Sequence, residues 1–214
     1  MKLNKKEGIE LLDRFGLPTV KILNPMSLTA DSPELKDGIS VRLSPKGGTG
    51  RNVFLPSIHN VKNLSQIQQF IEENKHKYDV ILHKTVKPEI IGTISKLKFR
   101  NSIVIETYRN FEERTKGIIN NRVIIPVFAD RTYVSKLEIE KKDPKDFREF
   151  CKVILILKDI PFNEYEMEYV IEDGSVIFTE LTLPNNREYR SYKGYIIDED
   201  SDFFKNLFFI KKSS

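Results

Sequence analysis

The chain has 214 residues, of which 39% are hydrophobic and 31% charged, and its formal net charge is +4. These values are typical of a soluble globular protein that is long enough to bury a substantial core. The small excess of positive charge gives no support to a nucleic-acid-binding protein, and no apolar run approaches the roughly 20 residues that span a bilayer.

Two further features predict where the protein works. The N-terminal residues 1–7 lack the apolar core of a signal peptide. Cys151 is the only cysteine, so it cannot form a disulfide within the chain, which fits a reducing compartment. We interpret it as a buried structural thiol because it lies in an apolar helical pattern. We therefore expect a cytoplasmic protein without a membrane partner, and the sequence leaves open whether it forms a homodimer.

The first 84 residues predict helices and strands in mixed order. A helix is expected from Lys5 to Phe15, with Asn4 as its N-cap and Gly16 at its end. The stretch 24–37 is rich in Pro, Ser and Asp and predicts a loop with room for one helical turn. The other expected elements are a strand at 17–23, β runs at 38–44 and 51–55, a helix from 63 or 65 to 75, and a strand at 78–83.

The chain becomes strongly β-rich from residue 89 onward. The turn signal Glu172-Asp173-Gly174 predicts a hairpin of strands 164–171 and 175–183. The other expected elements are strands at 90–96, 102–107, 115–120, 122–128 and 132–140, and helices at 143–157 and 203–210. This order predicts an α+β fold with mostly antiparallel sheets and a few packed helices. We expect two lobes, residues 1–84 with the glycine-rich loop and residues 85–214 with the hairpin.

A glycine-rich loop between two β runs is the first candidate site. Its glycines allow a tight turn in which backbone N–H groups face an anion, and basic residues surround that turn. Two interpretations stay open, a lid over a triphosphate and an ordinary hairpin whose basic side chains are solvated. The residues concerned are Arg42, Lys46, Gly47, Gly48, Thr49, Gly50 and Arg51.

The hairpin at 164–183 is the second candidate site. Glu164, Glu166 and Glu168 share one face of a strand because side chains alternate with period two. Glu180 lies on the return strand, where the turn brings it near Glu168. Two facing carboxylates repel unless a cation or a proton lies between them, and Mg²⁺ prefers carboxylate and phosphate oxygens. The alternative is a surface hairpin in a chain that is rich in Glu.

Taken in order, these segments resemble the ATP-grasp fold, in particular the nucleotide-binding domain of phosphoenolpyruvate synthase and pyruvate phosphate dikinase. The matching pieces are Lys5–Pro18, the Ser-Val-Arg strand at 40–44, the hinge-like stretch 80–93, the loosely similar stretch 112–120, and Glu166–Gly174. The family's hinge Gln is His83 here, the glycines before Glu112 are missing, and Thr182 stands where related ligases have Asn. The phosphohistidine and phosphoenolpyruvate domains of the complete synthases have no counterpart in these residues.

The resemblance implies that ATP and Mg²⁺ are bound between the two lobes. It places Arg42 and a lysine (Lys5, Lys6 or Lys21) on the phosphates, with Arg42 and Lys5 as the catalytic pair, and Glu168 and Glu180 on the metal. For His83 a structural hydrogen-bonding role stays open beside contact with adenine. The remaining nucleotide-binding residues that it implies are Lys21, Lys46, Gly47, Gly48, Thr49, Gly50 and Lys84.

Three functions follow as hypotheses. The first is an ATP-dependent ligase or phosphotransferase that acts through a phosphorylated intermediate on an unknown small-molecule or protein acceptor. The second is a non-catalytic nucleotide-binding or scaffold subunit, which the departures from the family pattern favour. The third and weakest is a nucleic-acid-binding protein, suggested by interleaved aromatic and basic residues at 108–109 and 189–193.

Overall fold

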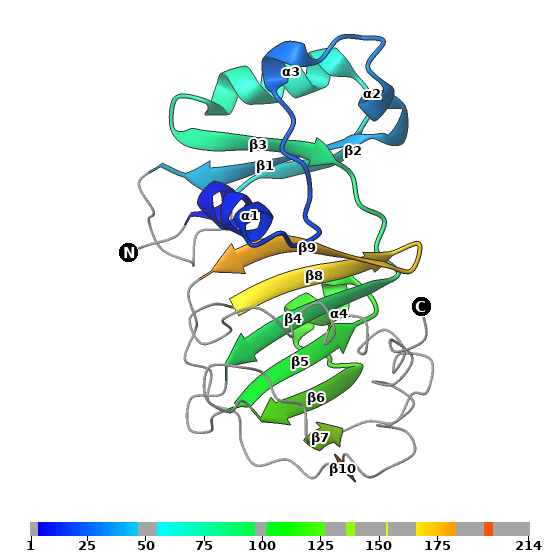
Figure 1. Ribbon diagram of the computed structural model, residues 1–214. Coiled ribbons are helices and arrows are strands. Elements are labelled where there is room, and N and C mark those ends of the chain that lie inside the picture. The colour runs from blue at the N-terminus through cyan, green and yellow to red at the C-terminus, as the bar shows by residue number, and fades with distance from the viewer. Residues whose placement is uncertain are drawn as a thin grey trace. The chain divides into compact units, whose positions relative to one another are not determined.

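The computed structural model divides the chain into two compact units (Figure 1). The first unit comprises residues 1–87 and 178–182, and the second comprises residues 88–177 and 183–214. In the described part of the chain, no helix combines the length and apolarity needed to cross a membrane. The structure describes residues 4–46, 55–96, 102–126, 136–139, 153, 166–182 and 195–198.

The helices of the first unit begin at polar caps that the sequence supplies. Helix α1 (Lys5–Arg14) has a capping box, in which the Asn4 side chain accepts from the Glu7 backbone N–H and the Glu7 carboxylate accepts from the Asn4 N–H. Asn63 caps helix α3 (Leu64–Asn74) in a similar way. Between them lie the short helices η1 (Pro25–Ser27) and α2 (Pro33–Asp37).

A three-stranded antiparallel sheet forms the centre of the first unit. Its strands are β1 (Ile39–Pro45), β2 (Ser57–Val61) and β3 (Tyr78–Lys84), in the order β2-β1-β3. In Figure 1, α3 lies over one face of this sheet and α1 lies at the opposite face. Arg42, at the middle of the central strand, pairs with Ser57 on one side and with Ile81 on the other.

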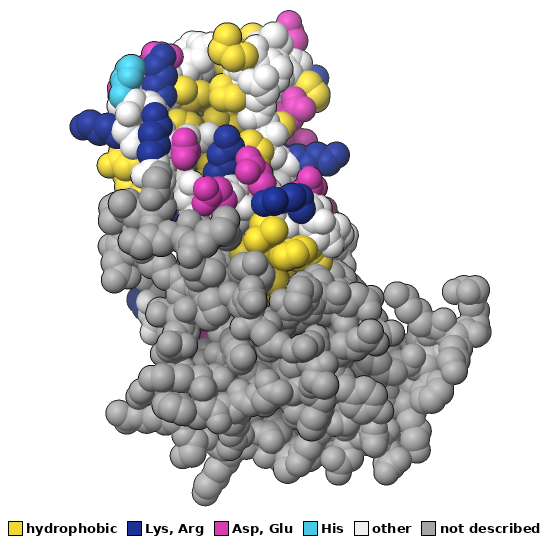
Figure 2. Space-filling view, turned by 60° about the vertical axis from the view of Figure 1, so that its left-hand side comes forward, with side chains coloured by type: hydrophobic (Ala, Val, Ile, Leu, Met, Phe, Trp, Pro, Cys, Tyr) yellow, Lys and Arg dark blue, Asp and Glu magenta, His cyan; other side chains and the backbone are white. Residues whose placement is uncertain are grey.

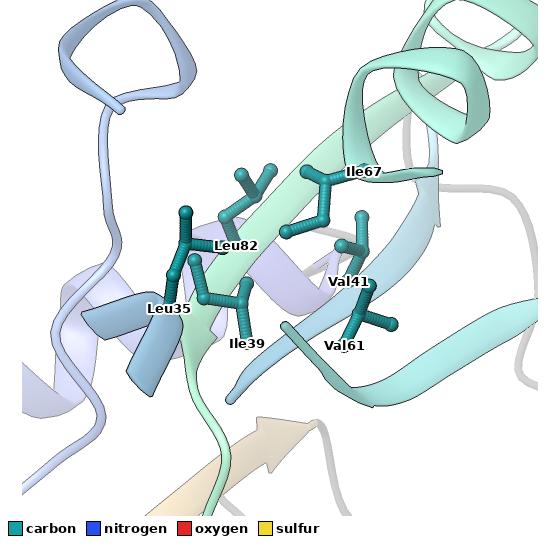
Figure 3. Close-up of a cluster of buried hydrophobic side chains, with 6 residues drawn as sticks. All are labelled: Leu35, Ile39, Val41, Val61, Ile67 and Leu82. Atoms are coloured by element: carbon teal, nitrogen blue, oxygen red, sulfur yellow. The ribbon is translucent and has the colours of Figure 1, made fainter. Parts of the chain in front are cut away.

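The core of the first unit lies between this sheet and α3. Alternation along β1 directs Ile39 and Val41 toward α3 and leaves Ser40 and Arg42 on the opposite face. Figure 3 shows six buried side chains of this core, which come from α2, all three strands and α3: Leu35, Ile39, Val41, Val61, Ile67 and Leu82. Burial of these side chains favours one register of β1, because a shift by one residue would place Arg42 in the core.

The segment 178–182 is held in the first unit by α1 and by the residues that follow it. The Phe178 N–H donates to the Pro18 carbonyl at 2.8 Å, and Thr19 Oγ1 donates to the Phe178 carbonyl at 2.8 Å. On α1, Gly8 lies so close to Leu181 that a Cβ on Gly8 would be 2.3 Å from the Leu181 carbonyl oxygen. A glycine in α1 is therefore required by close backbone approach rather than by a turn.

The second unit is built on antiparallel strands. Helix α4 (Phe111–Lys116) connects β5 and β6. The strands form a seven-stranded sheet in the order β10-β7-β6-β5-β4-β8-β9. Their bounds are β4 (Ile90–Lys96), β5 (Ser102–Tyr108), β6 (Asn121–Pro126), β7 (Lys136–Ile139), β8 (Glu166–Glu172), β9 (Ser175–Thr182) and β10 (Tyr195–Asp198).

The prediction of an α+β fold with antiparallel sheets and few helices is confirmed. Two local predictions are wrong. Residues 17–23 form no strand and make only single bridges at Thr19 and Leu23. The expected strand at 115–120 is absent: residues 115 and 116 end α4, which Asn110 caps and Gly117 ends in the left-handed conformation with φ 68°, and residues 117–120 form neither helix nor strand. The expected helix at 203–210 and all of the helix at 143–157 except Val153 lie outside the described residues.

We expect Gly8→Ala to destabilise the protein, although alanine is the better helix former. The added methyl group would meet backbone atoms of Leu181, which cannot swing away as a side chain can. Overpacking of this kind costs about 1–3 kcal/mol, measurable by denaturant unfolding. Asp13→Ala on the exposed side of α1 is the matched control, and equal stability of the two variants would contradict the close approach.

Candidate functional site

The candidate site of the first unit is the sheet face opposite α3. It carries the polar side chains of the central strand, Ser40, Arg42 and Ser44, which alternate with core residues. Ser40 and Ser44 are buried, and Arg42 is about one fifth exposed. Because buried polar groups require partners, the contacts of these side chains define the chemistry of the face.

A cluster of three charges lies on this face. Arg42 Nη2 donates to Glu180 Oε2 at 2.8 Å, and Lys5 Nζ lies 3.4 Å from the same oxygen. The Glu180 side chain is only 12% exposed, so its charge is shielded from water and held by two cations. The Lys5 backbone N–H also donates to Ser44 Oγ at 3.1 Å, which attaches the first turn of α1 to β1. The structure thus brings together Lys5, Arg42 and Glu180, three residues that the sequence selected.

His83 lies on the same face, at the position paired with Ser40. Its Nδ1 is 2.7 Å from the Lys84 carbonyl oxygen, so Nδ1 carries the proton and donates, and Nε2 is left as an acceptor. Nε2 is buried and has no hydrogen-bond partner among the described residues. Burial, assisted by the nearby charge of Arg42, lowers the pKa of His83 to about 4 in spite of that bond. His83 is therefore a neutral imidazole, and its Nε2 atom requires a hydrogen-bond donor.

A chain of hydrogen bonds extends from the edge strand β2 to the end of β3. His59 Nε2 lies 2.9 Å from Ser57 Oγ, and His59 Nδ1 lies 3.2 Å from Ser40 Oγ. Ser40 Oγ in turn lies 2.9 Å from Thr85 Oγ1. Burial and the charge of Arg42 lower the pKa of His59. The sequence analysis did not select His59, although Ser57 and His59 have the spacing of one strand face.

The other lysines selected from the sequence are placed apart from this cluster. Lys46 Nζ donates to the Lys75 carbonyl at 2.9 Å, at the C-terminal end of α3, where a cation is favourable. Lys84 pairs with Asp37 at 2.9 Å, and this lysine lowers the pKa of Asp37. Lys21 is exposed. Gly47, Gly48, Thr49 and Gly50 lie outside the described residues, so their part in binding stays a prediction.

The second unit carries a polar row across its sheet. The strand register aligns Glu168, Thr93, Glu106 and Arg122 on β8, β4, β5 and β6. Arg122 Nη2 lies 2.7 Å from Glu106 Oε1, and the Tyr108 hydroxyl donates to Glu106 Oε2 at 2.9 Å. The Glu106 carboxylate, 3% exposed, is therefore fully paired inside the sheet. Sequence reasoning missed this group, although Glu106 and Tyr108 have the spacing of one strand face.

Glu168, one of the two predicted metal ligands, forms an ion pair with Arg114 of α4. Both predicted metal ligands are thus paired with an arginine inside their own unit, Glu168 with Arg114 and Glu180 with Arg42. Within the described ranges, no three His, Cys, Asp or Glu side chains gather as a metal cluster. Each carboxylate by itself is a ligand of the kind that Mg²⁺ takes, since Mg²⁺ binds one or two carboxylates and completes its shell with phosphate oxygens and water.

Charges of both signs are mixed on the surface of the described residues. On the face in Figure 2, Lys and Arg side chains of these residues lie among Asp and Glu side chains. A continuous basic surface is what nucleic-acid binding requires. This face gives no support to the nucleic-acid hypothesis.

Comparison with known proteins gives similarity only at the level of structure. No family model and no curated protein matches the sequence. The solved structures similar to this chain include the N5-carboxyaminoimidazole synthase of Aspergillus clavatus with ADP, at 14% identity and a TM-score of 0.45, over 87% of this chain and 46% of that one. Another is the D-alanine–D-alanine ligase of Bacillus anthracis, at 17% identity and a TM-score of 0.42, over 86% and 58%.

A third similar structure is the ATP-grasp ligase PsnB complexed with a minimal precursor, at 14% identity and a TM-score of 0.39, over 87% of this chain and 52% of that one. The chain spans 46%, 58% and 52% of the lengths of these three solved structures. It spans 42% of the length of a fourth, the N5-carboxyaminoimidazole synthetase from Staphylococcus aureus. The finer resemblance to phosphoenolpyruvate synthase and pyruvate phosphate dikinase stays a prediction.

We expect stability to fall as the pH drops from 7 toward 4 because of His83. An unfolded histidine has a pKa near 6.5 and binds a proton in this range, whereas the folded imidazole stays neutral down to about pH 4. The unfolded state then binds more protons than the folded state, so the free energy of unfolding decreases by about 2 kcal/mol by pH 4.5. Denaturant unfolding of the protein and of His83→Gln checks this. The difference between their free energies of unfolding should shrink at low pH. If the two free energies instead change in parallel with pH, His83 has an ordinary pKa.

We expect Arg122→Met to destabilise the second unit strongly. The change leaves the Glu106 carboxylate buried without its cation, at a cost of about 3–5 kcal/mol in thermal or denaturant unfolding. Lys116→Met is the matched control, since it removes a cation from the exposed pair with Glu112 and should cost under about 1 kcal/mol. The double variant with Glu106→Gln should recover part of the loss, and no recovery would assign the effect to packing of the Arg122 stem.

Proposed function

We propose that this chain binds ATP with Mg²⁺ and forms the nucleotide-binding part of an ATP-dependent ligase of the ATP-grasp type. The observation that carries the proposal is the Lys5–Arg42–Glu180 cluster on the sheet face that also holds His83. Cationic donors for phosphates, a carboxylate for a metal and an acceptor for a nucleobase lie on one face of one sheet. The resemblance in the sequence selected the same residues independently of their positions in space.

Lys5 and Arg42 supply the phosphate contacts in this proposal. Arg42 is held on the central strand of the sheet between Ser57 and Ile81, so its backbone position is fixed. Lys5 is fixed at the start of α1 by the bond from its N–H to Ser44. A guanidinium and an ammonium that already share one carboxylate oxygen are spaced to share one phosphate oxygen. Lys6 is less suited, because it lies near Glu10 on the exposed side of α1.

His83 supplies a contact for the base. Its protonation is fixed by the Lys84 carbonyl, so Nε2 accepts a hydrogen bond and cannot donate one at neutral pH. The exocyclic amino group of adenine is a donor of the required kind. Pairing with it would relieve a buried acceptor that otherwise costs about 1–3 kcal/mol. This preference agrees with the sequence hypothesis that His83, in the hinge-like stretch 80–93, contacts adenine.

Glu168 and Glu180 would hold the metal ion. When bound there, Mg²⁺ supplies positive charge that neutralises the transferring phosphoryl group, which is the main electrostatic requirement of such reactions. The residues of this chain contribute the rest, since Arg42 and Lys5 orient the phosphates and His83 orients the base. Lys46, the last described residue before the predicted glycine loop, donates to the Lys75 carbonyl at the end of α3.

The acceptor and the chemical step are the finer part of the proposal. A ligase would use ATP to activate an acid as an acyl phosphate, which an amine or thiol then attacks, and a phosphotransferase would pass the phosphoryl group to a partner protein. The similar structures include a carboxyaminoimidazole synthase with ADP, a D-alanine–D-alanine ligase and an ATP-grasp ligase with a minimal precursor. The chain has about half their length, so an acceptor site on a further segment or a partner is compatible with the proposal.

A nucleotide-binding subunit without catalysis is the second candidate. The ion pair of Glu168 with Arg114 favours it, because an arginine beside a metal ligand competes with the metal. Turnover of ATP with a panel of acids and amines separates the two candidates. Release of ADP that depends on an added acceptor supports the enzyme, and tight binding without turnover supports the subunit.

We expect Mg·ATP to raise the melting temperature of the protein, because a ligand that binds only the folded state stabilises it. Arg42→Gln should weaken Mg·ATP binding by about tenfold or more, as expected for the loss of a charge-assisted hydrogen bond. Glu168→Gln should abolish the Mg²⁺-dependent part of binding. Arg14→Gln, on the exposed end of α1, is the matched control, and calorimetry that finds equal affinity for all of these proteins would refute the site.

A further inference from the structure

Glu180 occupies the place that the proposed function gives to a phosphate oxygen. Its Oε2 atom lies 2.8 Å from Arg42 Nη2 and 3.4 Å from Lys5 Nζ. The exposed fractions of the three side chains are 12% for Glu180, 21% for Arg42 and 37% for Lys5. The carboxylate is therefore an internal anion bound by the same two cations that a phosphate would use.

We propose that Glu180 makes this site selective for metal-loaded polyphosphates and against metal-free ones. The inference rests on the proposed function and adds to it a rule about which form of the ligand binds. While Glu180 is paired with Arg42 and Lys5, a metal-free triphosphate is repelled by the carboxylate. The donors of Arg42 and Lys5 that would bind the triphosphate are then already bonded to Glu180. When Glu180 coordinates a divalent cation, its carboxylate releases both side chains for the phosphates.

Charge counting supports the selectivity. Lys5 and Arg42 carry two positive charges and Glu180 one negative charge, so the cluster has a net charge of only one. A metal-free triphosphate brings several negative charges close to a carboxylate that is largely shielded from water, where like charges repel most. A metal ion removes that repulsion and leaves two cations for the phosphate. The metal and the phosphate therefore strengthen the binding of each other through one side chain, and this coupling must be reciprocal.

The backbone around Glu180 restricts the exchange to the side chain. Two residues earlier, Phe178 is hydrogen-bonded to Pro18 and Thr19, and one residue later, Leu181 lies against Gly8 of α1. Movement of the strand would break these contacts and bring Leu181 out of a fully buried position. Rotation of the Glu180 side chain breaks the ion pairs with Arg42 and Lys5, which the incoming phosphate replaces. The site needs no large rearrangement for this exchange.

The test is Glu180→Gln, which keeps the shape of the side chain and removes its charge. Binding of inorganic tripolyphosphate and of ATP is measured by calorimetry, in EDTA and in excess Mg²⁺. The wild-type protein should bind both ligands tightly only with Mg²⁺. The variant should bind metal-free tripolyphosphate about tenfold more tightly than the wild type, because a strong charge-assisted contact is freed for it. Its affinity should no longer increase with Mg²⁺.

Two further variants keep the result interpretable. Glu10→Gln removes an exposed acid from α1 and should leave all four affinities unchanged. Glu180→Asp keeps the charge and should retain the preference for the metal-loaded ligand, so a folding defect in the glutamine variant would leave this readout in place. Mg·ATP binding by the wild type with no gain for Glu180→Gln in EDTA would overturn the selectivity and leave the proposed function standing. Failure of the wild type to bind Mg·ATP would overturn both.

Discussion

The ion pair between Arg42 and Glu180 joins residues that are 138 positions apart in the chain. It depends on two constraints that act on the backbone rather than on the charges. Arg42 is fixed because its neighbours on β1 are buried against α3, and Glu180 is fixed because the residues beside it are bonded to α1 and to the segment that follows α1. The position of this ion pair therefore follows from close packing at Gly8 and Leu181 as much as from electrostatics.

The central sheet separates a hydrophobic face from a polar face by simple alternation. Odd-numbered residues of β1 enter the hydrophobic core, and even-numbered residues form the polar face with His83 and the Lys5–Arg42–Glu180 cluster. The two sets of side chains point to opposite faces of the sheet. The fixed protonation of His83 belongs to the same arrangement, because the strand that buries the ring also presents the Lys84 carbonyl to its Nδ1.

The second unit uses charge differently. Glu106, Tyr108 and Arg122 form a buried and fully paired group in the middle of the sheet, which makes it a structural element. Glu168 is one strand away from Thr93 in the same row, and its partner Arg114 comes from α4.

The sequence by itself determined the α+β class, most element positions, and the identity of Lys5, Arg42, His83 and Glu180 as residues of interest. The class and the elements follow from local patterns, namely period-two alternation, helix caps and turn residues, which depend on neighbours within a few positions. The glycine-rich loop and the Glu-rich hairpin pointed to Arg42 and Glu180, whereas Lys5 and His83 were selected only through the resemblance to the ATP-grasp family. Tertiary structure alone decided which charges meet, that His83 has a fixed tautomer, and that Glu106 and Arg122 are paired. Such contacts depend on strand register and on close approach between distant segments, and no local pattern encodes either of them.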